Sequence, residues 1–517
     1  MRFRRQVSDH PMLVSDTSDN ATHPPSSDST IAEHISEDEV ADSPLAGQAE
    51  VEPKRQDDPA LAHGDDIVPE TRGANGLSRA ETSPGRPQRR LSTMSTRSRL
   101  SATIEINKVL LKDRIMRFTA SWFTVIMGTS IINSLAYLLP WTSTHAGLRV
   151  FGLCFLIASS FLFIVFSILT IARYILFKGI FLVALRHEVH ALFFGAIPMA
   201  LATIAVGIAL QGDGCGLPGA IDAGAGLWWS SFLLAAATAT VVPWVMFTEH
   251  NHSEVALTAT WLLPVVPLQT VGSAGADIAE LLASRRPGYA FTILISSYIA
   301  NGVGLLLCLF ILTLYFQRLV LHHLPGREVI VSTFLPLSPC GQGAAALINL
   351  GRISTTIFPE MARRHPDSQY LALLAQTALP LYGAGLAFGL MLWGLGIWWL
   401  ALAVVSVSRS YWKRDVVFNM GWWAFTFPCG SLCLATLAIA ESLDSIFFRV
   451  IATMLAFLVL FTWLLVAVPT SYGWATGSVF ISPSLDHLPP ILPVRISANS
   501  RKRHRALRHA RLRGHKG

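Results

Sequence analysis

Ten apolar stretches follow one another through the middle of the chain, separated by short polar connections. A membrane-spanning helix needs about 20 predominantly apolar residues, and each stretch is close to that length. The pattern therefore predicts an all-α membrane protein with ten transmembrane helices. The expected spans are 118–139, 148–172, 191–210, 227–247, 257–281, 289–316, 329–350, 379–407, 416–440 and 447–468.

Proline recurs inside every other stretch. It removes a backbone donor and disrupts a helix, and such a break is tolerated in a membrane where the helix faces protein or water rather than lipid. We therefore expect five helical hairpins around a central pore, with the odd-numbered helices inside and the even-numbered ones outside. The alternative reading is that proline is simply frequent in membrane helices. The interior prolines of the odd stretches are Pro198, Pro264, Pro267, Pro336, Pro339 and Pro428, and Gly128 lies at the comparable depth of the first.

The two ends of the chain differ from its middle. The first hundred residues are rich in Ser, Asp, Glu, Pro and Thr, a composition that cannot bury enough apolar surface to fold. Lys and Arg gather before the first span, in the loops after the second, sixth and eighth spans, and after the tenth. By the positive-inside rule both termini are cytoplasmic, although Arg285, Arg286, Arg363 and Arg364 fall on the outer side and count against this. We expect a disordered cytoplasmic tail at 1–112, a ten-helix membrane domain at 113–472 and a basic cytoplasmic tail at 473–517.

Composition narrows the class of protein. Hydrophobic residues make up 52% of the chain and charged ones 14%, whereas soluble proteins carry about 25% charged residues. The net charge of +7 belongs to tails and loops, so we expect a lipid bilayer and no nucleic acid as partner. The six cysteines show neither a disulfide framework nor zinc spacing. Without a catalytic constellation or a phosphate-cradling glycine loop, the sequence predicts no enzyme, no cofactor and no metal.

The polar side chains of the odd stretches are small and neutral, and no charged residue occupies a span centre. Asp277 and Glu280 lie near the end of the fifth stretch and are interpreted as interfacial. Cation pathways usually display acidic rings, whereas broken helices offer amides and partial dipoles that hold an anion weakly. An inside-negative potential drives anions outward by about 2.3 kcal/mol per charge per 100 mV, so we expect an anion path that favours efflux. Its expected lining is Thr129, Ser130, Pro198, Thr203, Pro264, Pro267, Pro339, Gln342, Thr426 and Pro428.

The ninth stretch carries an aromatic run just before its proline. Phe427 precedes Pro428 and is biased away from helical geometry. A bulky ring at a break in a lumen would serve as a hydrophobic plug. The plainer interpretation makes Phe427 one packed or lipid-facing aromatic among 28 phenylalanines.

Five motifs in the odd stretches resemble one known family. The segments Phe118–Thr129, Ile197–Thr203, Trp261–Pro267, Leu337–Gly343 and Phe418–Pro428 are similar, in order, to motifs of the tellurite-resistance/dicarboxylate transporter family. Within it, the fungal branch of sulfite efflux pumps and malic acid transport proteins is the most similar. The likeness covers about 118–470. The sequence departs from the pattern at Ser130 and Ala200, where glycine is usual, and at Cys340, where leucine is common.

The resemblance implies a fold shared with the plant slow-type anion channels. Five hairpins would surround a pore, a phenylalanine of the ninth helix would occlude it, and the assembly would be a homotrimer with one pore per subunit. That phenylalanine corresponds best to Phe427, with Phe425 as the second choice. The implied function is plasma-membrane efflux of sulfite or hydrogen sulfite, and the alternative is transport of malate or another C4-dicarboxylate. A membrane sensor signalling through the N-terminal tail is a third interpretation.

Overall fold

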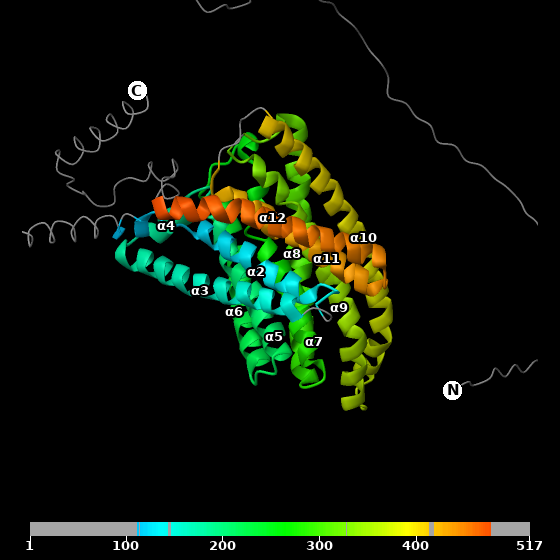
Figure 1. The fold of residues 1–517 in the computed structure, drawn as a ribbon. Coiled ribbons are helices and arrows are strands. Elements are labelled where there is room, and N and C mark those ends of the chain that lie inside the picture. The colour runs from blue at the N-terminus through cyan, green and yellow to red at the C-terminus, as the bar shows by residue number, and fades with distance from the viewer. Residues whose placement is uncertain (1–110, 113, 143–145, 327, 413–417, 477–517) are drawn as a thin grey trace, which may run out of the picture. The chain divides into compact units, whose positions relative to one another are not determined.

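The computed structural model describes residues 111–112, 114–142, 146–326, 328–412 and 418–476 (Figure 1). The expected tails at 1–112 and 473–517 lie almost wholly outside these residues. The described part is helical, with no strand among its elements. Its α-helices are α2 (Phe123–Leu138), α3 (Ala146–Leu176), α4 (Ile180–Arg186), α5 (Ala196–Gly214), α6 (Ala220–Thr248), α7 (Val266–Ala283), α8 (Pro287–His322), α9 (Leu337–Arg364), α10 (Gln369–Trp412), α11 (Thr426–Ser442) and α12 (Ile446–Thr476).

The helices form two concentric layers. α2 packs on α5, α5 on α7, α7 on α9, α9 on α11 and α11 again on α2, which closes a ring of five. Each ring member also packs against the helix that follows it in the chain, namely α3, α6, α8, α10 and α12. The predicted hairpins and the inner and outer positions of their helices are therefore confirmed.

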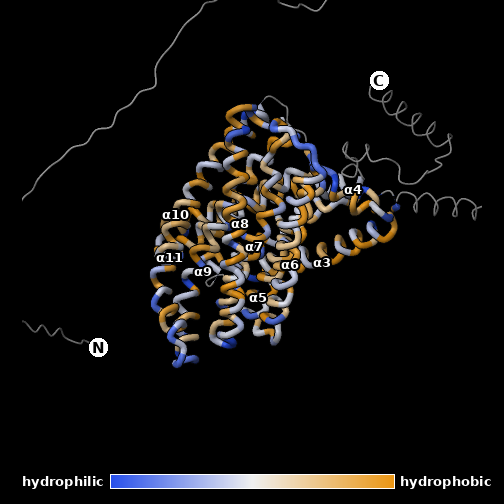
Figure 2. The backbone as a smooth tube through the Cα atoms, turned by 180° about the vertical axis from the view of Figure 1, so that it is seen from behind, coloured by the Kyte–Doolittle hydropathy of each residue, from blue (hydrophilic) through white to orange (hydrophobic). Residues whose placement is uncertain are grey.

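Burial separates the two layers. In the apolar windows of the spans that contain α2, α5 and α11, 83–89% of the residues are buried, against 17–33% in α3, α6, α8, α10 and α12. Hydrophobic positions extend along α3 and α10, with hydrophilic ones gathered towards the helix ends (Figure 2). The outer helices thus present the apolar surface that lipid requires.

Eight described helical segments are long and apolar enough to cross a membrane. α7 and α9 are not among them, because Gln269, Asp277 and Glu280 in α7 and Gln342 and Arg352 in α9 lower their hydropathy. Both lie in the ring, where neighbouring helices rather than lipid surround them. Their polarity is tolerated for that reason.

The expected helix breaks take a specific form. A short 3₁₀ segment precedes each inner α-helix: η1 (Ala120–Trp122), η2 (Leu192–Gly195), η4 (Ala259–Leu262), η5 (Ile330–Phe334) and η6 (Met420–Phe425). Pro336 directly precedes α9 and Pro264 lies between η4 and α7. The other prolines stand within the first turn of the α-helix that follows, where an α-helix has no use for their missing amide. They therefore mark a change of helix type rather than an interruption deep within an α-helix.

Close contact between inner helices depends on glycine. A Cβ added at Gly341 of α9 would lie 2.4 Å from the Ser431 carbonyl carbon and 2.5 Å from the Leu432 nitrogen of α11. Backbone atoms cannot move aside as a flexible side chain does. By contrast, nothing lies within 4 Å of a Cβ placed at Gly394 on the outer helix α10.

We predict that Gly341→Ala destabilises the domain by about 1–3 kcal/mol, the usual cost of overpacking. Gly394→Ala is the matched control, since it adds the same methyl group to a helix with open space. The thermal unfolding midpoint of purified protein in detergent measures the difference. Equal midpoints for the two variants would contradict the contact between α9 and α11.

Candidate functional site

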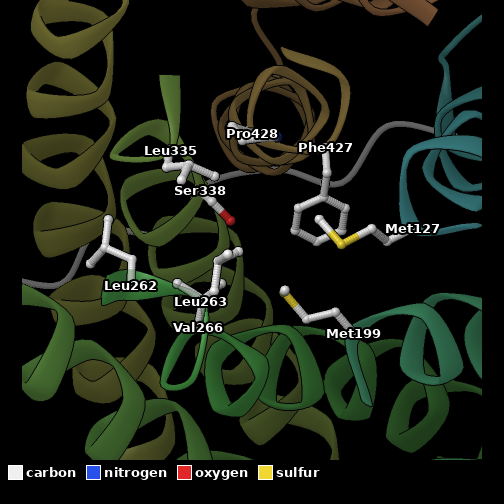
Figure 3. A pocket seen from close by; sticks show the side chains of 9 residues that line it. All are labelled: Met127, Met199, Leu262, Leu263, Val266, Leu335, Ser338, Phe427 and Pro428. Carbon is white, nitrogen blue, oxygen red and sulfur yellow. The ribbon is translucent and has the colours of Figure 1, made fainter. Parts of the chain in front are cut away.

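A small cavity occupies the centre of the ring. Its volume is about 10 Å³, and every inner segment contributes to its lining. Figure 3 shows Phe427, Met127 and Met199 pointing towards one another, with the Ser338 oxygen directed into the same space. The lining residues are Met127, Met199, Leu262, Leu263, Val266, Leu335, Ser338, Phe427 and Pro428. Apolar side chains therefore close the middle of the ring, and we call this level the constriction.

Phe427 and Phe425 have different surroundings. Phe427 is 1% exposed and lines the constriction. The ring of Phe425 packs edge-on against Phe334 at 4.8 Å and Trp422 at 5.7 Å, outside the cavity lining. The position therefore favours Phe427 over Phe425 as an occluding ring.

A polar layer lies one helical turn beyond the constriction, about 6 Å along the helix axes. Ser130 of α2 and Thr203 of α5 place their hydroxyl oxygens 2.5 Å apart. The Gln342 amide of α9 donates to the Ser431 hydroxyl of α11 at 3.1 Å. These bonds join neighbouring inner helices, and Ser130, Thr203 and Gln342 are among the residues that the sequence analysis predicted for the path.

Gln269 of α7 completes this layer. Its amide nitrogen donates to the carbonyl oxygen of Pro339 at 3.3 Å, while its Oε1 is buried without a hydrogen-bond partner. The Ser338 hydroxyl, at the constriction, is likewise buried and unpaired. An unpaired buried polar group is costly, and of these two the Ser338 hydroxyl lines the cavity.

The remaining predicted path residues lie elsewhere. Thr129 accepts a hydrogen bond from the indole of Trp463 on the outer helix α12. The hydroxyl of Thr426 donates to the Trp423 carbonyl of η6. The Pro198 carbonyl accepts from Ser231 of α6. The structure thus turns these groups towards helix contacts rather than the cavity.

Pro264 and Pro267 flank the start of α7, next to cavity-lining residues but outside the lining itself. Pro264 packs closely against η2: a Cβ added at Gly195 of η2 would lie 3.2 Å from the Cα of Pro264. Of the predicted prolines, only Pro428 lines the cavity.

Sequence reasoning missed most of the constriction. Met127, Met199 and Val266 are apolar residues in apolar stretches, and nothing in their type sets them apart. Their position does: Met199 follows Pro198, Val266 precedes Pro267, and Ser338 and Phe427 each precede a proline. A position directly next to a proline of an odd-numbered stretch was therefore the sequence signal that could have identified these lining residues.

The electrostatics of the ring favour anions. From the start of each inner segment through the polar layer, the described inner helices carry no charged side chain. The first turns of α7, α9 and α11 contribute lining residues, and the N-terminus of a helix carries partial positive charge. A neutral path with such dipoles can hold a small anion without trapping it.

Comparison with known proteins now identifies the family. The family model described as voltage-dependent anion channel matches residues 117–471. The chain belongs to this family. Its members are channels and transporters rather than enzymes, and the helices described above fit a multi-pass membrane protein.

Individual relatives have narrower names. A sulfite efflux pump of Arthroderma otae is 32% identical over 371 residues, which cover 71% of this chain and 93% of the relative. A sulfite efflux pump of Arthroderma benhamiae is 33% identical over the same shares. A malic acid transport protein of Schizosaccharomyces pombe is 23% identical over 375 residues, covering 71% of this chain and 80% of the relative. Anion transport is the activity these relatives share.

We predict that Ser338→Ala lowers anion flux several-fold and leaves the thermal midpoint unchanged. The hydroxyl donates no hydrogen bond within the protein, so its loss costs stability little, whereas a passing anion loses a donor. Flux per reconstituted molecule, measured in vesicles, tests this.

Thr436→Ala provides the control. The Thr436 hydroxyl accepts from the Trp393 indole at 2.9 Å, away from the cavity, so this variant should lose stability but keep its flux. Wild-type flux in Ser338→Ala would exclude the hydroxyl from the path.

Proposed function

We propose that this protein exports sulfite or hydrogen sulfite across the plasma membrane, through the ring of inner helices. The observation that carries the proposal is the constriction, where all five inner segments line one uncharged cavity that includes the Phe427 ring. The likeness to sulfite efflux pumps at 32–33% identity supports the substrate. Malate or another C4-dicarboxylate is the second candidate, supported by the more distant malic acid transport protein.

The gate is a steric and dewetting barrier. The Phe427 ring faces two thioethers, Met127 and Met199, in an otherwise apolar lining. A hydrated anion cannot shed its water among such groups at low cost, so the ring must move or be removed before an anion passes. Hydrophobic constrictions close channels in this way.

The polar layer would receive the anion after the ring moves. Hydroxyls of Ser130 and Thr203 and the amide of Gln342 supply neutral donors. Such donors hold an ion less tightly than a charged side chain does. Weak binding allows release, which conduction requires.

Orientation and assembly complete the proposal. Lys and Arg at the ends of the spans favour cytoplasmic termini, so the constriction lies on the cytoplasmic side of the polar layer. The homotrimer implied by the family resemblance stays a prediction.

We predict that Phe427→Ala raises anion conductance in reconstituted vesicles, because truncating the ring opens the constriction. Phe425→Ala is the matched control: it removes an equal ring that packs on Phe334 outside the cavity, so it should lower stability without raising conductance. Unchanged conductance in both variants would remove the phenylalanine gate.

A paired growth assay tests the substrate. Expression in a sulfite-sensitive yeast should restore growth on sulfite, because outward flow of the anion follows the membrane potential. Radiolabelled malate uptake is measured in the same strain. Restored malate uptake without sulfite tolerance would favour the second candidate and reject the first.

A further inference from the structure

The face of each inner helix that contributes to the constriction continues outward. Residues spaced by three or four lie on one side of a helix. On α9 this stripe runs Ser338, Gln342, Ala345, Asn349 and Arg352. Ser338 lines the cavity and Gln342 belongs to the polar layer, so Arg352 lies on the continuation of the same face.

The stripe on α7 ends at the same level. It runs Val266, Gln269, Ser273, Asp277 and Glu280. On α11, Glu441 stands fourteen residues after Phe427, as Arg352 does after Ser338 and Glu280 after Val266. Fourteen residues correspond to about 21 Å along a helix, so three neighbouring inner helices carry charge at one level beyond the constriction.

These charges converge on a single guanidinium. Arg352 donates from Nη1 and Nη2 to the two oxygens of Glu280 at 2.9 and 3.0 Å. Its Nη1 also lies 3.4 Å from a carboxylate oxygen of Glu441. Asp277 interacts electrostatically with the same group. One positive side chain therefore faces three carboxylates at the outer end of the ring.

The ion pairs are accessible to solvent. The side chains of Glu280 and Glu441 are 47% and 63% exposed, and that of Arg352 is 26% exposed. The two glutamate carboxylates are solvated when they leave the guanidinium, so an anion from solution can take the place of one of them. The Arg352 Nε is buried and has no hydrogen-bond partner, which leaves one donor of the fork unused.

We propose that Arg352 is the outer contact point for the transported anion, a small oxyanion or halide, and that Glu280 and Glu441 compete with the anion for it. An arginine alone would bind an oxyanion in a bidentate manner and retain it. With carboxylates ready to replace the anion, the site exchanges it. The guanidinium thus supplies the positive charge that attracts an anion, and the carboxylates weaken its binding enough for release.

This inference rests on the proposed ring pathway, but it does not depend on sulfite as the substrate. Flux is therefore measured in proteoliposomes with sulfite and, separately, with chloride. If the wild type carries chloride and not sulfite, the sulfite proposal fails while the Arg352 comparison is still made with chloride.

Two opposite changes test the site. Arg352→Gln should lower flux at low anion concentration about tenfold, the effect of losing one charge-assisted hydrogen bond, and Arg352→Lys should recover part of it. The double variant Glu280→Gln, Glu441→Gln removes the competitors, so the half-saturating anion concentration should fall about tenfold. Arg363→Gln is the control, since Arg363 pairs with Glu360 on the same helix beyond this level and its loss should change neither quantity.

A purely structural ion pair gives a different result. It would lower the thermal midpoint in both the arginine and the glutamate variants while half-saturation stays at the wild-type value. If Arg352→Gln does not yield folded protein, the double glutamate variant decides, because it keeps the arginine. An unchanged half-saturating concentration in that variant would overturn the proposal.

Discussion

The fold depends on keeping polar backbone and side chains away from lipid. In a bilayer an unsatisfied amide or carbonyl costs several kcal/mol, yet each inner segment begins as a 3₁₀-helix and continues as an α-helix. Such a segment is tolerated only behind other protein. The outer helices provide that cover, and their own windows are 17–33% buried because they take the lipid contact instead.

Most buried hydroxyls of the inner layer bond within their own helix. Thr203 donates to the Met199 carbonyl, Ser431 to Phe427 and Thr436 to Leu432. A hydroxyl satisfied in this way adds little cost to a buried face and still offers an acceptor to a neighbour. Glycines such as Gly341 then let the helices approach to backbone contact, which suits association by van der Waals packing where lipid gives no hydrophobic drive.

The sequence predicted the architecture because that architecture rests on signals local to each segment. Apolar length marked the spans, and alternating proline marked which spans lie inside. Side-chain direction was not predictable in the same way: Thr129 is as small and neutral as Thr203, yet it faces Trp463 of the outer layer. Direction depends on the rotation of each helix in the ring, which the packing of all five decides together.

Arg352 escaped sequence reasoning for a different reason. The hydropathy pattern ends the predicted seventh span at residue 350, whereas α9 continues to Arg364. Arg352 therefore fell outside the predicted span. Its acidic partners, Glu280 and Glu441, come from helices far apart in the chain, and no local pattern joins them to it.

The constriction, the polar layer and the charged outer end of the ring have different chemical properties, and one surface could not combine them. In the proposed pathway, apolar groups at the constriction exclude a hydrated ion, neutral donors one turn on replace part of its hydration, and Arg352 at the outer end exchanges the anion against carboxylates. Placing charge at the constriction would bind the anion and stop transport, because a desolvated ion pair is much stronger than an exposed one. Phe427 and Glu441 are about 21 Å apart along α11, and the Coulomb energy falls in inverse proportion to distance. The outer charges can therefore act more strongly on an approaching or departing ion than on one at the constriction.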